Sequence, residues 1–193
     1  MLPQKTLFDR QARTWPARLA RGLLRLGGWR VEGRLPRDLV RCVLIGAPHT
    51  SRWDFWYMLL GALVLRLDLR WVASGPMGKL RQRLTEALGG MVVPAGQHPG
   101  FLVAHIARSL KQHPGRVQLV LSPHTLDHRG QDWHTGFYWI ARSAQVPVVL
   151  AYIDYGRRCV GLGPQVHLSG DIQADMRTIR KFYANIQARH PIA

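Results

Sequence analysis

The chain has 193 residues, 47% of them hydrophobic, and its 27 lysines and arginines outnumber 11 acidic residues for a formal net charge of +16. This length and apolar share allow one compact domain with a substantial core that needs no disulfides or metal, so a secreted disulfide protein is not expected. The only cysteines, Cys42 and Cys159, lie far apart and are expected to be buried or partly buried thiols in a reducing compartment. No secretory signal peptide is expected, because the N-terminal residues mix charges and lack a continuous apolar run.

The first segment, residues 1–30, is strongly cationic, with seven basic residues against the single Asp9 and a local charge of +6. A helix over residues 16–26 is predicted, with Pro16 in its first turn. Its apolar face is formed by Trp15, Leu19, Leu23 and Leu26, and its basic face by Arg18, Arg21 and Arg25. This pattern fits an interfacial helix on an anionic membrane, and it fits equally a helix packed on its own domain with a solvated basic face.

The remaining residues, 31–193, are expected to form one α/β domain. Strands are predicted at residues 42–45, 70–73, 91–93, 117–121, 148–153 and 159–161. Helices are predicted at residues 53–65, 77–88, 101–112, 136–143 and 172–189. This alternation favours a mostly parallel central sheet flanked by helices on both faces. The most apolar stretch, residues 55–65, is shorter than the ~20 residues of a membrane span, so a buried helix is expected there.

The turn after the first of these strands carries the pair that we consider first for chemistry, His49 and Asp54. Such strand-to-helix turns often hold functional residues. A carboxylate in the first helical turn can hold one imidazole nitrogen while the other accepts a proton near neutral pH. The same spacing also fits a helix cap, with Ser51 as N-cap and Asp54 at the third helical position. The spacing alone leaves both interpretations open.

Several segments, taken in order, resemble the motifs of one enzyme family. They are Ala47-Pro48-His49-Thr50-Ser51-Arg52-Trp53-Asp54-Phe55, Gly89-Gly90-Met91-Val92-Val93, Ser122-Pro123, Trp133-His134-Thr135-Gly136-Phe137-Tyr138 and Val146-Pro147-Val148-Val149-Leu150. They resemble the motifs of the lysophospholipid acyltransferase superfamily, which includes the bacterial 1-acylglycerol-3-phosphate acyltransferases. The resemblance covers the chain from about Trp15 to His190. It implies a glycerol-phosphate acyltransferase-like fold and acyl transfer from a thioester, with His49 as general base and Asp54 orienting it.

Two motifs depart from the family pattern. Ala95 stands where the second motif usually has an arginine for the acceptor's phosphate, and Asp127 stands where the third motif has another. Neither side chain can replace the planar fork of arginine. His124 and Thr125 occupy acceptor-binding positions of the family, and Arg129 follows closely enough to supply a displaced positive charge. These three are therefore the candidate acceptor-binding residues, for a head group other than glycerol phosphate.

The resemblance implies acyl-CoA or acyl carrier protein as donor, a lysophospholipid-like or other lipid acceptor, and no metal or other cofactor. It also implies a bacterial enzyme of phospholipid biosynthesis, cytoplasmic and peripheral on the inner face of the cytoplasmic membrane. The acidic donors suit a basic protein surface. A catalytically silent lipid-binding relative is the alternative that the changed motifs leave open.

Two other features of the sequence suggest different classes of function. Histidines and aspartates crowd into one loop that by composition resembles a metal site: His124, Asp127, His128, Asp132 and His134. Their spacing matches no known zinc pattern, so a solvated loop is favoured. The high positive charge also suggests nucleic-acid binding, but the arginines are dispersed among apolar residues without a recognisable binding motif.

Overall fold

The computed structural model describes residues 6, 8, 14–48, 50–75, 77–93, 96–123 and 133–190. Six α-helices and seven β-strands occur in these ranges. In chain order they are α1 (Thr14–Leu26), β1 (Arg30–Glu32), β2 (Arg41–Gly46), α2 (Arg52–Leu65), β3 (Leu69–Ser74), α3 (Lys79–Ala87), β4 (Gly90–Val93), α4 (Pro99–Lys111), β5 (Val117–Leu121), α5 (Gly136–Ala144), β6 (Val148–Asp154), β7 (Cys159–Val166) and α6 (Ile172–Tyr183).

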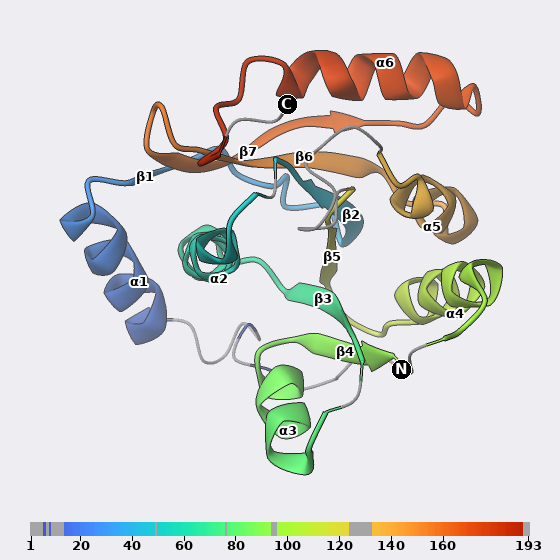
Figure 1. Ribbon diagram of the computed structural model, residues 1–193, viewed down its shortest axis with the longest axis horizontal. Coiled ribbons are helices and arrows are strands. Elements are labelled where there is room, and N and C mark those ends of the chain that lie inside the picture. Colours follow the sequence, from blue (N-terminus) through green and yellow to red (C-terminus); the bar gives the residue numbers. More distant parts are fainter. Residues whose placement is uncertain are drawn as a thin grey trace.

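The strands form a single sheet in the order β1-β7-β6-β2-β5-β3-β4 (Figure 1). All described strand pairs are parallel except β6 with β7, which is antiparallel. The predicted α/β class and mostly parallel sheet are confirmed. Every strand and helix expected from the sequence is present, although α6 ends at Tyr183 rather than residue 189. Strand β1, which has only three residues, was not predicted from the sequence.

Helices cover both faces of the sheet, as expected from the alternating elements. Strand β2 shows why, since four consecutive residues are fully buried: Cys42, Val43, Leu44 and Ile45. Cys42 and Leu44 pack with α1 and α2, whereas Val43 and Ile45 pack with α4, α5 and α6. Figure 1 shows α1 and α2 on one side of the sheet and α4 and α5 on the other. Both buried strand faces therefore belong to hydrophobic cores, the arrangement typical of parallel sheets.

Both cysteines lie in strands of this core as free thiols. Cys42 and Cys159 are 0% exposed. Burial disfavours the charged thiolate and raises the pKa of Cys42 to about 12 and that of Cys159 to about 11. The prediction of buried thiols is confirmed.

Helix α1 packs on α2 with a face other than its apolar stripe. Its Ala20 and Leu24 are buried in the interior. The predicted apolar face remains exposed, with relative exposures of 69% for Trp15, 55% for Leu19, 49% for Leu23 and 87% for Leu26. An apolar stripe turned away from the domain is unusual for a helix that serves only to cover a core.

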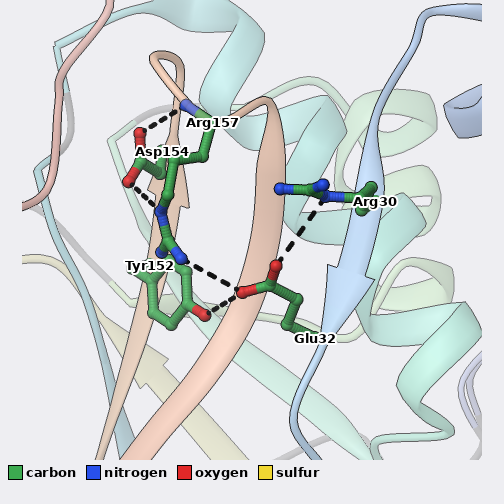
Figure 2. Close-up of polar contacts among 5 residues, drawn as sticks. All are labelled: Arg30, Glu32, Tyr152, Asp154 and Arg157. Atoms are coloured by element: carbon green, nitrogen blue, oxygen red, sulfur yellow. Dashed lines mark hydrogen bonds and ion pairs between the residues drawn. The ribbon is translucent and has the colours of Figure 1, made fainter.

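The short strand β1 is held at the edge of the sheet by a polar cluster around Glu32 (Figure 2). The hydroxyl of Tyr152 in β6 donates to Glu32 Oε2 over 2.9 Å, passing across Gly161 of β7. A Cβ at Gly161 would lie 2.5 Å from the Tyr152 ring, so only glycine leaves room for this contact. Arg157 binds both Glu32 (3.5 Å) and Asp154 (2.8 Å). These contacts are tertiary, which explains why local sequence did not indicate this strand.

No helix in the described part of the chain is long and apolar enough to cross a membrane.

Candidate functional site

The turn between β2 and α2 places Asp54 at the edge of the sheet where β2 ends. Ala47 and Pro48 are buried and joined by a cis peptide bond. His49 lies outside the described residues, so the predicted pairing of His49 with Asp54 stays a prediction. Helix α2 begins directly after Ser51, and Asp54 in its first turn is only 1% exposed.

Backbone groups of the turn hold one carboxylate oxygen of Asp54. Oδ2 accepts from the backbone N–H of Thr50 at 2.9 Å and of Ser51 at 2.8 Å. The Ser51 hydroxyl accepts from the N–H of Trp53 at 3.2 Å, completing a capping box. The capping role considered from the sequence is thus present. It occupies Oδ2 and does not by itself account for Oδ1.

The other oxygen of Asp54 accepts a hydrogen bond from a residue that the sequence analysis did not identify. The hydroxyl of Tyr155 donates to Oδ1 over 2.6 Å, a short bond of the kind expected for an ionised acceptor. Burial, and secondly this bond to Asp54, raises the pKa of Tyr155, so the phenol stays protonated as a donor. No sequence signal marks this contact, because Tyr155 follows β6 and is 101 residues away along the chain.

Aromatic packing fixes the ring of Tyr155. The Trp29 ring meets it edge-on with centroids 5.1 Å apart, and the Tyr57 ring does so at 5.9 Å. Trp29 and Tyr57 are themselves stacked at 4.0 Å. Such edge-to-face and stacked pairs restrict ring orientation. The Asp54 carboxylate is therefore held from both sides, by the helix cap and by a packed tyrosine.

The sheet brings other motif segments to the same edge. In the β2–β5 pairing Ile45 lies opposite Leu121, so Ser122, the first residue of the third motif, follows next to the end of β2. Strand β4, which carries the second motif, ends at the same edge because it is parallel to β3, and β3 is parallel to β5. The three motifs therefore meet along one edge, where parallel α/β sheets commonly bind ligands.

The remaining predicted site residues fall mostly outside the described chain. His124, Thr125 and Arg129 lie there, as do Ala95, Asp127, His128 and Asp132. His134 is described and exposed, and its backbone N–H donates to the carbonyl of Pro123 at 2.8 Å. Among the described residues no group of three or more His, Cys, Asp or Glu side chains is placed to hold a metal ion.

An apolar cavity of about 530 Å³ opens beside Asp54, between α2 and the sheet. Pro48 and Asp54 line it at the turn, and Met58, Ala62 and Leu65 of α2 line it farther along. Strands β2, β3, β5, β6 and β7 supply the opposite wall. Asp54 is the single carboxylate among the described lining residues. The volume lies within the ~300–1,000 Å³ typical of small-molecule sites.

Comparison with solved structures identifies a protein of similar fold. Among solved structures, the chain is similar to the crystal structure of the 1-acyl-sn-glycerophosphate (LPA) acyltransferase, PlsC, from Thermotoga maritima, with a TM-score of 0.56. The likeness covers 94% of this chain and 84% of that chain at 14% sequence identity. No protein-family model matches the chain, and no curated protein matches it by sequence. The expected acyltransferase-like fold is thereby confirmed.

Proposed function

We propose that the protein is an acyltransferase that moves a fatty acyl group from a thioester, acyl-CoA or acyl carrier protein, to a lysophospholipid-like or other lipid acceptor. The observation that carries the proposal is the buried, doubly anchored carboxylate of Asp54 beside an apolar cavity, five residues after His49. The likeness in fold to PlsC supports it.

In the proposed reaction, His49 removes the proton from the acceptor hydroxyl or amine while Asp54 orients the imidazole and stabilises the imidazolium. The acceptor atom attacks the thioester carbonyl and forms a tetrahedral intermediate. Its collapse breaks the carbon–sulfur bond, and the proton held by His49 passes to the departing thiolate. Tyr155 and the backbone N–H groups of Thr50 and Ser51 act on this reaction by holding Asp54. The scheme requires no metal or other cofactor.

The cavity has the capacity for a long acyl chain. The cavity of about 530 Å³ lies within the range of ~300–1,000 Å³ that holds drug-sized or lipid-sized ligands. Its apolar walls favour burial of such a chain by about 0.8 kcal/mol per methylene. The capacity therefore suits a long-chain fatty acyl donor or a lipid acceptor.

The acceptor is proposed to be bound by His124, Thr125 and Arg129. Ala95 and Asp127 replace the arginines that would clamp glycerol phosphate, so a head group with hydrogen-bonding amides or hydroxyls fits better. His124→Ala should raise the KM for the acceptor. Unchanged KM and turnover in His124→Ala would remove this residue from the acceptor site.

Because the proposed acceptor is a membrane lipid, we propose that the protein works peripherally at the inner face of the cytoplasmic membrane. The exposed apolar stripe of α1, flanked by arginines, supports attachment to an anionic surface. Leu19→Glu together with Leu23→Glu should reduce flotation with anionic vesicles. The matched control is Leu80→Glu with Leu84→Glu, which alters two exposed leucines of α3. Equal losses in both pairs would argue against α1 as the membrane anchor.

Product identification tests the proposed activity. The purified protein is incubated with labelled acyl-CoA or acyl carrier protein and a total bacterial lipid extract, and new acylated lipids are identified by mass spectrometry. We expect a labelled lipid that also reveals the acceptor. Folded protein that yields no product with either donor would favour the alternative, a catalytically silent lipid-binding relative, for which the altered Ala95 and Asp127 positions are the supporting observation.

A further inference from the structure

A second hollow, of about 430 Å³, lies between α1, β1 and the end of α2. Among the described residues that line it are five arginines and no carboxylate. The arginines are Arg21, Arg25, Arg30, Arg34 and Arg66. Buried Leu24 and Trp29, 2% and 7% exposed, also line it and fix the backbone on either side of the α1–β1 turn.

Folding brings these arginines together from four separate places. Arg21 and Arg25 are one turn apart on α1 and so share a helix face. Arg30 begins β1, and Arg34 follows that strand. Arg66 caps the C-terminal end of α2 in the left-handed conformation, with φ of 56°. Because the residues come from distinct elements, the cationic hollow is a product of tertiary structure rather than of one basic run.

Glu32, the acidic side chain that contacts Arg30 of the hollow, is also engaged by other groups. Glu32 contacts Arg30 Nε at 3.8 Å, and it is shared with the hydroxyl of Tyr152 and the guanidinium of Arg157 (Figure 2). Among the described residues no ion pair joins Arg21, Arg25 or Arg34 to an acidic side chain, so these three arginines leave the hollow with a positive surplus. Gathered like charges repel one another, and a concave cationic surface concentrates small anions.

We infer that this hollow is a binding site for a phosphate-bearing anion. Arginine forks donate paired hydrogen bonds that match phosphate oxygens, and several forks around one concavity can contact a single phosphate group from different sides. Two sources of that chemistry fit: the head group of an anionic phospholipid, reached while α1 lies on a membrane, and a soluble phosphate compound.

The hollow is separate from the candidate active site. Arg66 follows Asp54 by twelve residues of α2, which corresponds to about 18 Å along the helix at ~1.5 Å per residue. Among the described residues, Leu65 is the one that lines both the hollow and the apolar cavity. The inference therefore does not depend on acyl transfer and is tested by binding alone.

The test compares two double variants that each remove two positive charges. Arg34→Gln with Arg66→Gln alters the hollow without changing α1, and Arg81→Gln with Arg83→Gln alters two exposed arginines of α3. Thermal unfolding checks that each variant is folded. If the Arg66 change lowers the melting temperature appreciably, Arg21→Gln with Arg34→Gln replaces that pair.

Two binding experiments, the soluble arm and the lipid arm, distinguish a soluble phosphate compound from a lipid head group. Isothermal titration with inorganic phosphate measures the soluble arm, and flotation with phosphatidylglycerol vesicles measures the lipid arm. We expect at least one arm to show binding that is retained in the α3 pair and weakened roughly tenfold or more in the hollow pair. Binding in the first arm identifies a soluble ligand, and binding confined to the second identifies a lipid head group. Equal weakening in both pairs, or no weakening in the hollow pair in either arm, would overturn the inference.

Discussion

Filling the apolar cavity beneath α2 should shorten the acyl chain that the protein prefers. Ala62 lines the cavity and is 3% exposed. Ala62→Leu adds three carbons, and leucine is well tolerated in helices. The three added carbons take up space that about three carbons of a bound acyl chain would otherwise fill. We therefore expect the preferred chain to shorten by about three carbons.

The expected discrimination follows from the same geometry. Three methylenes that no longer fit cost about 2.4 kcal/mol at ~0.8 kcal/mol each, which is roughly a 50-fold change in the ratio of kcat/KM for long and short donors. The assay is competition among an equimolar series of saturated acyl thioesters, with products measured by mass spectrometry. Ala104→Leu on the exposed face of α4 is the matched control.

An unchanged chain-length preference in folded Ala62→Leu would refute the assignment of this cavity to an acyl chain. The same preference shift in Ala104→Leu would also refute it, because that residue does not line the cavity.

Two further predictions concern single polar groups. Burial by itself would raise the pKa of Asp154, but hydrogen bonds and charge from Arg157 outweigh it and hold the pKa below its ordinary value. The resulting stabilisation is complete above the unfolded pKa of about 3.9 and is lost as the pH falls through the folded pKa. Urea unfolding should therefore show a smaller loss of stability on acidification in Asp154→Asn than in the wild type, and equal losses would contradict this. Tyr155→Phe removes the donor to Asp54 and should lower kcat roughly tenfold with little change in KM, since the hydroxyl contacts the carboxylate and not the substrate. Tyr57→Phe, in the same aromatic cluster, is its control. Similar kcat values in the two variants would show that the cap alone positions Asp54.

Local sequence pattern predicted the elements that have strong local signals. The buried run around Val43 and Leu44 identified β2, and the helical spacing of Leu19 and Leu23 identified α1. Pattern could not decide which face of α1 packs, because Ala20 and Leu24 form a second apolar face and α2 selects it. Packing against α2 therefore determines which of the two apolar faces of α1 is buried.

In the candidate site too, local spacing predicted one part, and contacts between distant residues could not be predicted. The cap formed by Ser51 and Asp54 depends on neighbours three residues apart, so spacing was enough to indicate it. The bond from Tyr155 joins residues far apart in the chain, and the same holds for the tyrosine and arginine contacts that hold β1. The arginine hollow also joins residues from α1 through Arg66. These features depend on the order of strands in the sheet, which residue spacing does not encode.

The proposed pairing of His49 with Asp54 is tested most directly by the rates of thiol release and lipid acylation. These rates are measured for the wild type, His49→Ala and Asp54→Asn under identical donor and acceptor concentrations. General acid–base catalysis typically contributes ~10²–10⁴-fold, so we expect losses of that size in kcat for His49→Ala and a marked loss for Asp54→Asn. Thermal unfolding separates lost catalysis from lost folding, because Asp54 also caps α2. Wild-type turnover that persists undiminished in folded His49→Ala would contradict the proposed mechanism.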